Sequence, residues 1–273
     1  MSYLWGAAKL LFFTAVTALT GLTHFAVVPL LTWSGARHRA GRASAWVFRN
    51  WARISLRTLG ARVEVRGPVP TAPFFLVSNH LGYIDIMVLA SVLDCVFVSR
   101  ADVARWPVVG ALVRMVGTVF IDRETKRDIP RVLARIEENL THGRGIVVFP
   151  EGTSSGGATV LPFRPSLLEV AARARMAVSC ASLTYRTDPG NPPAHLAVCW
   201  WGDVSFAAHF LALFRLSGFL GTVTFGENRI VESDRKELAS RAREVVLSQF
   251  EPVSDPDRYN DRPLPDDDAV SNN

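Results

Sequence analysis

A histidine and an aspartate stand five positions apart in the segment NHLGYID, residues 79–85. On a continuous helix His80 and Asp85 would diverge by about 140°, so the chain must bend to bring them together, which Gly82 permits. A carboxylate on one imidazole nitrogen fixes the tautomer and makes the other nitrogen a better base. The pair therefore has the chemistry of a general base that takes a proton from a hydroxyl. The alternative is that Asp85 only caps a helix and His80 bonds locally.

Two further segments carry polar groups directly after apolar runs. GTVFIDR, residues 117–123, ends in Arg123, whose fork of donors suits a phosphate, although an ion pair in a loop is the alternative. FPEGTSS, residues 149–155, ends in a carboxylate and a glycine turn whose backbone N–H groups could cradle an anion. A polar turn capped by Thr153 or Ser154 is the alternative there. Because open α/β sheets bind ligands at the carboxyl ends of their strands, we expect the three segments to converge.

In this order and at these separations, the three segments closely resemble the first three motifs of the glycerolipid acyltransferase family, which includes bacterial 1-acylglycerol-3-phosphate acyltransferase. The resemblance spans residues 70–225 and implies that His80 is the general base and Asp85 the carboxylate that orients it. Two departures are present, since Arg164 is followed by Pro165 in place of glycine and the fourth motif, residues 177–185, lacks its usual proline. The resemblance also implies these substrate-binding residues: Asn79, Gly117, Arg123, Glu151, Gly152 and Thr153.

The reaction implied by this resemblance is direct transfer of a fatty acyl group from acyl-CoA or acyl carrier protein to the free hydroxyl of a lysophospholipid. It needs no metal, no cofactor beyond the acyl donor and no covalent enzyme intermediate. The expected acceptor is 1-acylglycerol-3-phosphate, which would give phosphatidic acid. A lysophospholipid with a larger headgroup or a lyso-aminolipid remains an open alternative.

Two other functions also remain open. Residues 152–156 fit G-x-S-x-G, the nucleophile elbow of serine hydrolases, with Ser154 as nucleophile. The glycines and prolines that follow Ser154 disfavour the helix that an elbow requires. The second alternative is a membrane-bound lipid-binding protein without catalysis, because a fold can outlive its chemistry.

The candidate catalytic segments must be positioned by a framework in which strands and helices alternate. Apolar runs predict strands at 74–78, 95–99, 118–121 and 145–149, and helical spacing predicts helices at 84–93, 107–115 and 129–140. Later runs at 177–185, 196–201 and 221–225 could extend the sheet, and residues 234–250 predict a closing amphipathic helix. This alternation is typical of an α/β fold, with a mostly parallel sheet flanked by helices.

The N-terminal part is organised differently and predicts a membrane-anchoring helical segment. Residues 10–33 carry no formal charge and are long enough to cross a hydrocarbon core of about 30 Å, although Pro29 could turn them into an interfacial hairpin. Between Arg37 and Arg66, eight arginines are opposed by Glu64 alone. Because they follow an apolar stretch, anionic headgroups are a closer partner than nucleic acid. The positive-inside rule then places the catalytic domain on the cytoplasmic face of the inner membrane.

Residues 43–59 predict either an interfacial amphipathic helix or a helix packed on the domain. We therefore expect a membrane anchor and basic helix in residues 1–66, an acyltransferase domain in 67–250 and a disordered acidic tail in 251–273. The three cysteines, Cys95, Cys180 and Cys199, lie far apart and lack C-x-x-C spacing. They predict neither a disulfide framework nor a zinc site, and they fit a reducing compartment.

Overall fold

One mixed sheet forms the centre of the protein. The computed structural model describes residues 3–35, 37–101, 104, 110, 117–121 and 129–255. Within these residues, seven strands are ordered β1-β7-β6-β2-β5-β3-β4. Neighbouring strands pair in parallel, except that β6 and β7 are antiparallel. The expected α/β class is confirmed. The strands are β1 (Ala61–Arg66), β2 (Phe75–Ser78), β3 (Cys95–Arg100), β4 (Val119–Ile121), β5 (Gly145–Val148), β6 (Val178–Thr187) and β7 (Phe219–Phe225).

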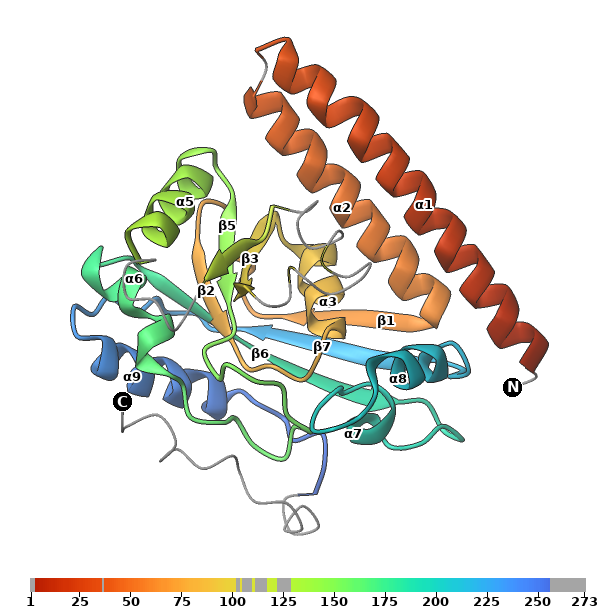
Figure 1. Ribbon diagram of the computed structural model, residues 1–273. Coiled ribbons are helices and arrows are strands. Elements are labelled where there is room, and N and C mark those ends of the chain that lie inside the picture. Colours follow the sequence, from red (N-terminus) through yellow and green to blue (C-terminus); the bar gives the residue numbers. More distant parts are fainter. Residues whose placement is uncertain are drawn as a thin grey trace.

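Helices cover both faces of this sheet (Figure 1). One face carries α2 (Arg37–Leu59), α3 (Ile84–Val92) and α8 (Phe206–Leu213), and the other carries α5 (Ile129–Thr141), α6 (Glu169–Arg173) and α9 (Arg235–Ser248). Successive side chains of β2 point to opposite faces of the sheet. Leu76 packs into the hydrophobic core on the α3 face, and Phe75 and Val77 pack into the core on the α9 face. Residues 79–85 follow β2 directly, so they leave the sheet at its middle.

Most of the elements expected from the sequence are present, with small shifts at their ends. The helix expected at 107–115 lies outside the described residues apart from Gly110. The expectation of a strand at 196–201 is wrong. The short helix α7 (Ala194–Ala197) begins after Pro193 and includes the first two residues of that range. An apolar run this short has no period that separates a strand from a buried helix or loop. Val198 and Cys199 fill the core without pairing in the sheet.

Both ends of the catalytic domain differ from the expected boundaries at residues 67 and 250. The sheet already begins at β1, which pairs along its whole length with β7. Arg62 and Arg66 lie on this strand and form ion pairs at its surface. Because of these arginines, the strand was counted with the basic segment in the sequence. At the other end, residues 251–255 lie against the domain, where the Val253 N–H donates to the Gly157 carbonyl oxygen at 2.7 Å. The rest of the expected disordered tail, residues 256–273, lies outside the described residues.

The N-terminal helices form an antiparallel pair that runs along the outside of the domain (Figure 1). The first, α1 (Tyr3–Trp33), continues through Pro29 and is long and apolar enough to cross a membrane, with 6% of its most apolar window buried. The second, α2, buries Ala52 and Leu56 in the core below it. Residues 43–59 therefore form a helix packed on the domain. The indole N–H of Trp51 donates to the Thr17 hydroxyl at 3.0 Å and ties the two helices together.

Candidate active site

His80 and Asp85 are brought together by a bend between β2 and α3. The His80 Nδ1 and Asp85 Oδ2 atoms are 2.8 Å apart. The bend turns at Gly82, whose φ of +152° is rarely adopted by residues with side chains and whose carbonyl oxygen accepts from the Asp85 N–H at 3.2 Å. An added Cβ at Gly82 would stand 2.8 Å from the Trp200 backbone nitrogen. Residue 82 must therefore be glycine for two reasons, its conformation and the close approach of another segment.

The Asp85 carboxylate is fully buried and is held by four hydrogen bonds. Its Oδ2 atom accepts from the N–H groups of Leu81 and Gly82 at 2.6 and 3.0 Å and faces His80 Nδ1. Its Oδ1 atom accepts from the Tyr185 hydroxyl at 2.7 Å. A carboxylate that only accepts satisfies all of these donors, so Asp85 has one orientation and fixes that of His80. The alternative that Asp85 merely caps a helix does not account for its bond to His80.

Tyr185 is a hydrogen-bond partner of Asp85 that the sequence did not indicate. It lies on β6 and is 3% exposed. Burial raises the pKa of Tyr185 well above its ordinary value, and the Asp85 carboxylate raises it further. The phenol therefore stays protonated at neutral pH and acts as a donor to Asp85. No spacing rule connects residue 85 to residue 185, and only the pairing of β2 with β6 brings them together.

The His80 ring is oriented so that one nitrogen remains for a substrate. With Nδ1 directed at Asp85, the Nε2 atom is the candidate base, and the side chain keeps 22% of its surface exposed. The ring stacks on Phe149, with centroids 4.2 Å apart and an interplanar angle of 17°. Phe149 belongs to the segment 149–155, so this segment forms one wall of the catalytic site.

The segment 149–155 is joined to the catalytic loop through its backbone. Glu151 Oε1 accepts from the His80 N–H at 3.3 Å, and the Ser155 N–H donates to the His80 carbonyl oxygen at 3.0 Å. Gly152 turns the chain with a φ of +73°, and Thr153 is exposed beside it. The structure thus brings the predicted residues 151–153 next to His80.

The Glu151 carboxyl group is buried and only partly paired. Its Oε2 atom has no hydrogen-bond partner among the described residues. Burial raises the pKa of Glu151 well above its ordinary value, and the hydrogen bond from the His80 N–H offsets part of that rise. A protonated carboxyl group would remove the cost of an unpaired buried charge next to Asp85.

Two other predicted substrate-binding residues, Asn79 and Gly117, are placed differently. Asn79 is 1% exposed, and its amide bonds both the N–H and the carbonyl of Leu183 on β6, at 2.7 and 2.9 Å. It holds two strands together, and the structure does not support a substrate contact for it. Gly117 precedes β4 and lies at the amino end of the parallel strands, whereas His80 and Glu151 follow the carboxyl ends of theirs. The prediction for Gly117 therefore receives no support either. Arg123 lies outside the described residues.

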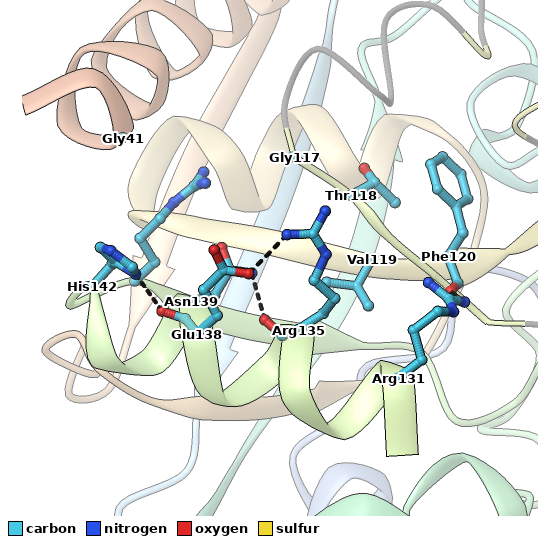
Figure 2. A pocket seen from close by; sticks show the side chains of 11 residues that line it. Gly41, Gly117, Thr118, Val119, Phe120, Arg131, Arg135, Glu138, Asn139 and His142 are labelled. Carbon is cyan, nitrogen blue, oxygen red and sulfur yellow. Dashed lines mark hydrogen bonds and ion pairs between the residues drawn. The ribbon is translucent and has the colours of Figure 1, made fainter. Parts of the chain in front are cut away.

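Gly117 instead borders a cavity of about 510 Å³ between β4, α5 and the start of α2. Figure 2 shows Arg131 and Arg135 of α5 beside β4, with Gly41 of α2 above them. Arg131 donates to the Phe120 carbonyl oxygen at 2.6 Å, and Arg135 pairs with Glu138 at 2.7 Å. Neither His80 nor Asp85 lines this cavity.

The serine-hydrolase alternative conflicts with the local backbone. No helix follows Ser154, because residues 154–164 form turns and irregular chain before the 3₁₀ turn η3 (Pro165–Leu167). A nucleophile elbow places its serine between a strand and a helix. The glycine-serine pattern at 152–156 is therefore a tight turn next to the catalytic loop and not an elbow.

Comparison with known proteins agrees with this geometry. The model of the Acyltransferase family matches residues 62–185. A lyso-ornithine lipid O-acyltransferase from Rhizobium meliloti (strain 1021) is 36% identical over 70% of this chain and 68% of its own length. The chain belongs to the acyltransferase family. This acyltransferase also resembles the lyso-ornithine lipid O-acyltransferase of Pseudomonas aeruginosa, at 32% identity over 80% of this chain and 85% of that protein.

Two further relatives of this acyltransferase carry a different name. A 1-acyl-sn-glycerol-3-phosphate acyltransferase from Neisseria gonorrhoeae is 31% identical over 55% of this chain and 63% of its own length. The solved structure of the 1-acyl-sn-glycerophosphate acyltransferase PlsC from Thermotoga maritima has the same fold, with a TM-score of 0.58 over 90% of this chain and 98% of that one, at 16% identity. The family match and the relatives named as O-acyltransferases confirm the enzyme class expected from the three sequence motifs.

Proposed function

We propose that this acyltransferase moves a fatty acyl chain onto the free hydroxyl of a lyso-lipid with an amino-acid headgroup, as in a lyso-ornithine lipid. This choice of acceptor rests on how much of the chain aligns with each group of relatives. The relatives named for lyso-ornithine lipid align over a clearly larger part of the chain than the relative named for 1-acylglycerol-3-phosphate. This acceptor is the lyso-aminolipid alternative, and it replaces 1-acylglycerol-3-phosphate as the first choice.

The turn beside His80 carries no basic side chain for a phosphate, and Arg123, which the sequence suggested for that contact, lies outside the described residues. Residues 149–163 contain no lysine or arginine, although arginine forks are the usual means of holding a phosphate. The next basic residue, Arg164, donates from Nε to the Glu151 carbonyl oxygen at 3.3 Å.

The geometry of His80 supports a direct transfer. Its Nε2 atom takes the proton from the acceptor hydroxyl while that oxygen attacks the thioester carbonyl carbon, and Asp85 stabilises the imidazolium. The carbon–sulfur bond then breaks, and the imidazolium returns its proton to the leaving thiolate. General-base assistance of this kind contributes about 10²–10⁴-fold. Both acyl-CoA and acyl carrier protein supply a suitable thioester, and the reaction consumes nothing else.

We also propose that α1 lies in the surface layer of a membrane, with the domain on the cytoplasmic side. The arrangement of α1 with α2 supports this position, because α2 runs beside α1 and carries Arg42, Arg49 and Arg53. An arginine at the centre of a bilayer costs about 2.5–3.5 kcal/mol or more. At the membrane surface the exposed Arg42 would meet anionic headgroups, whereas Arg49 pairs with Asp94 and Arg53 donates to the Ser91 carbonyl oxygen at 2.8 Å.

The test is acyl transfer by the full-length protein in detergent, offered a lyso-ornithine lipid and 1-acylglycerol-3-phosphate separately, with the products identified by mass spectrometry. We expect acylation of the lyso-ornithine lipid by the wild type and a loss of about 10²–10⁴-fold for His80→Ala. Acylation of 1-acylglycerol-3-phosphate alone would overturn the acceptor and keep the reaction. Equal activity of His80→Ala would overturn the mechanism.

A further inference from the structure

The outer face of α8 is apolar and exposed. The helix, with the sequence FAAHFLAL, contains no lysine, arginine, aspartate or glutamate, and it buries His209 and Leu213 on its inner side. The outward positions recur at helical spacing and are Ala207, Ala208, Leu211 and Ala212. Leu211 is 49% exposed. An exposed apolar helix face of this kind marks a contact with a protein or a membrane.

The identity of the partner follows from what lies beside this face. The Phe13 ring of α1 packs edge-on against Phe210 and Phe214, with centroids 5.5 Å apart in each case. At Gly6 the two segments are also in van der Waals range, since an added Cβ would stand 3.5 Å from the Phe214 carbonyl oxygen. The apolar surface of α1 therefore continues onto α8.

The adjoining part of α1 is also strongly exposed. Leu4 and Leu11 are 83% and 72% exposed, and they flank the positions through which α1 contacts α8. On the other side of α8, Val204 and Leu196 remain 45% and 60% exposed. A bilayer that covers the outer surface of α1 would therefore reach α8, which has no charged side chain of its own; Arg215 follows the helix and lies beside Gly6 at the edge of this surface.

The inner side of α8 contacts the catalytic loop. The Tyr83 hydroxyl lies 2.8 Å from His209 Nδ1. The Tyr83 ring packs against Phe206 at 5.0 Å and against Phe210 at 6.3 Å. Tyr83 lies between His80 and Asp85 in the chain. A single helix thus separates the outer apolar face from the loop that carries the catalytic base.

We propose that the outer face of α8 is a second membrane-contact surface, continuous with α1, which holds the catalytic loop at the bilayer surface where a lyso-lipid hydroxyl resides. This inference rests on the proposal that α1 lies in a membrane. It adds that the catalytic domain itself touches lipid. The bilayer is the partner because α8 extends a surface that α1 already presents to it.

Single reporters test the proposal in the full-length protein. Cys95, Cys180 and Cys199 are buried and unpaired, so a new surface cysteine can be labelled selectively with a fluorophore. Three variants report on three places: Leu22→Cys on α1, Leu211→Cys on α8, and Val231→Cys on the segment before α9, next to Ile230, which packs in the core on the α9 face of the sheet. Val231 is 55% exposed and matches Leu211 in character. Each labelled protein is placed in phosphatidylglycerol and phosphatidylethanolamine vesicles.

We expect nitroxide groups on the lipid chains to quench the fluorophore at residues 22 and 211, and aqueous iodide to quench it at residue 231. Quenching by lipid at 22 with quenching by iodide at 211 would overturn the role of α8 and leave the position of α1 intact. Quenching by iodide at both 22 and 211 would overturn both proposals. None of these readouts depends on which lyso-lipid is the acceptor.

A kinetic arm tests the consequence for catalysis. Leu211→Glu should raise the KM for a long-chain acceptor in vesicles about ten-fold, because a charge on this face opposes contact with lipid. Its activity on a short-chain, monomeric acceptor should stay at the wild-type level, which also shows that the variant folds. Val231→Glu is the matched control and should change neither value. Equal KM values for the two variants in vesicles would overturn the proposal.

Discussion

The Tyr185 hydroxyl donates a 2.7 Å hydrogen bond to Asp85 Oδ1 and so connects β6 to the first turn of α3. On its other oxygen, Asp85 faces His80 at 2.8 Å. The candidate base is therefore positioned through two buried links in series, of which the second comes from a distant strand. This arrangement makes the chemistry of His80 sensitive to a residue that no substrate needs to touch.

Removal of the Tyr185 hydroxyl tests that sensitivity. Tyr185→Phe leaves the Asp85 carboxylate with one donor fewer, so its negative charge is less stabilised and holds the imidazolium of His80 more tightly. We expect the acidic limb of the pH–rate profile to move to higher pH and kcat to fall about ten-fold. Unfolding should cost about 1.5–3 kcal/mol less, the contribution of a hydrogen bond to a charged group. Tyr83→Phe, which also loses a hydroxyl bond, is the control for stability, and its profile should not move. An unshifted limb in Tyr185→Phe would contradict the positioning role.

Gly82→Ala tests the close approach at the bend. The new Cβ would stand 2.8 Å from the Trp200 nitrogen, which donates to the Leu81 carbonyl oxygen at 2.9 Å. We expect loss of most activity, because the loop must open and separate His80 from Asp85. Gly143→Ala is the matched control, since Gly143 also has a positive φ, +73°, but meets no atom within 4 Å. That variant should lose only about 1–2 kcal/mol of stability and keep its activity. Comparable kinetics for the two variants would disprove the steric account.

The buried Glu151 carboxyl predicts a dependence of stability on pH. Because its pKa is raised in the folded protein, the folded state binds more protons than the unfolded state between the ordinary and the raised pKa. The free energy of unfolding should therefore fall as pH rises through that window. Glu151→Gln cannot ionise, so thermal unfolding measured from about pH 4 to about pH 8 should show a shallower decline. Glu244→Gln, at an exposed site, should keep the wild-type slope. The same slope in Glu151→Gln as in wild type would count against this assignment.

Ser154→Ala separates the acyltransferase from a serine hydrolase. The turn at Ser154 lacks the following helix of a nucleophile elbow, so we expect kcat within about two-fold of wild type, given that surface substitutions are usually small in effect. The measurement is thioester consumption with the preferred acceptor, beside His80→Ala. A loss as large as that of His80→Ala would restore Ser154 as a nucleophile.

The sequence by itself determined the elements close to the catalytic chemistry. The pairing of His80 with Asp85, the bend at Gly82 and the strands that precede residues 79 and 149 all follow from local spacing and apolar runs. Such features depend on a few neighbouring residues, because bond geometry and helix or strand periodicity act over short stretches of chain. The family was evident for the same reason, since its motifs are short and contiguous.

Only the tertiary structure decided which distant residues meet these motifs. Tyr185 and the backbone of Leu183 reach Asp85 and Asn79 because β6 is placed beside β2. Gly117 lies at the far end of the sheet because it precedes its strand, although its motif suggested a place at the site. The assignment of residues 61–66 to β1, of residues 194–197 to α7 and of the α8 face to the surface likewise required the whole packing. Sheet order and the choice of which apolar face is covered depend on the summed burial of all elements, which no local pattern contains.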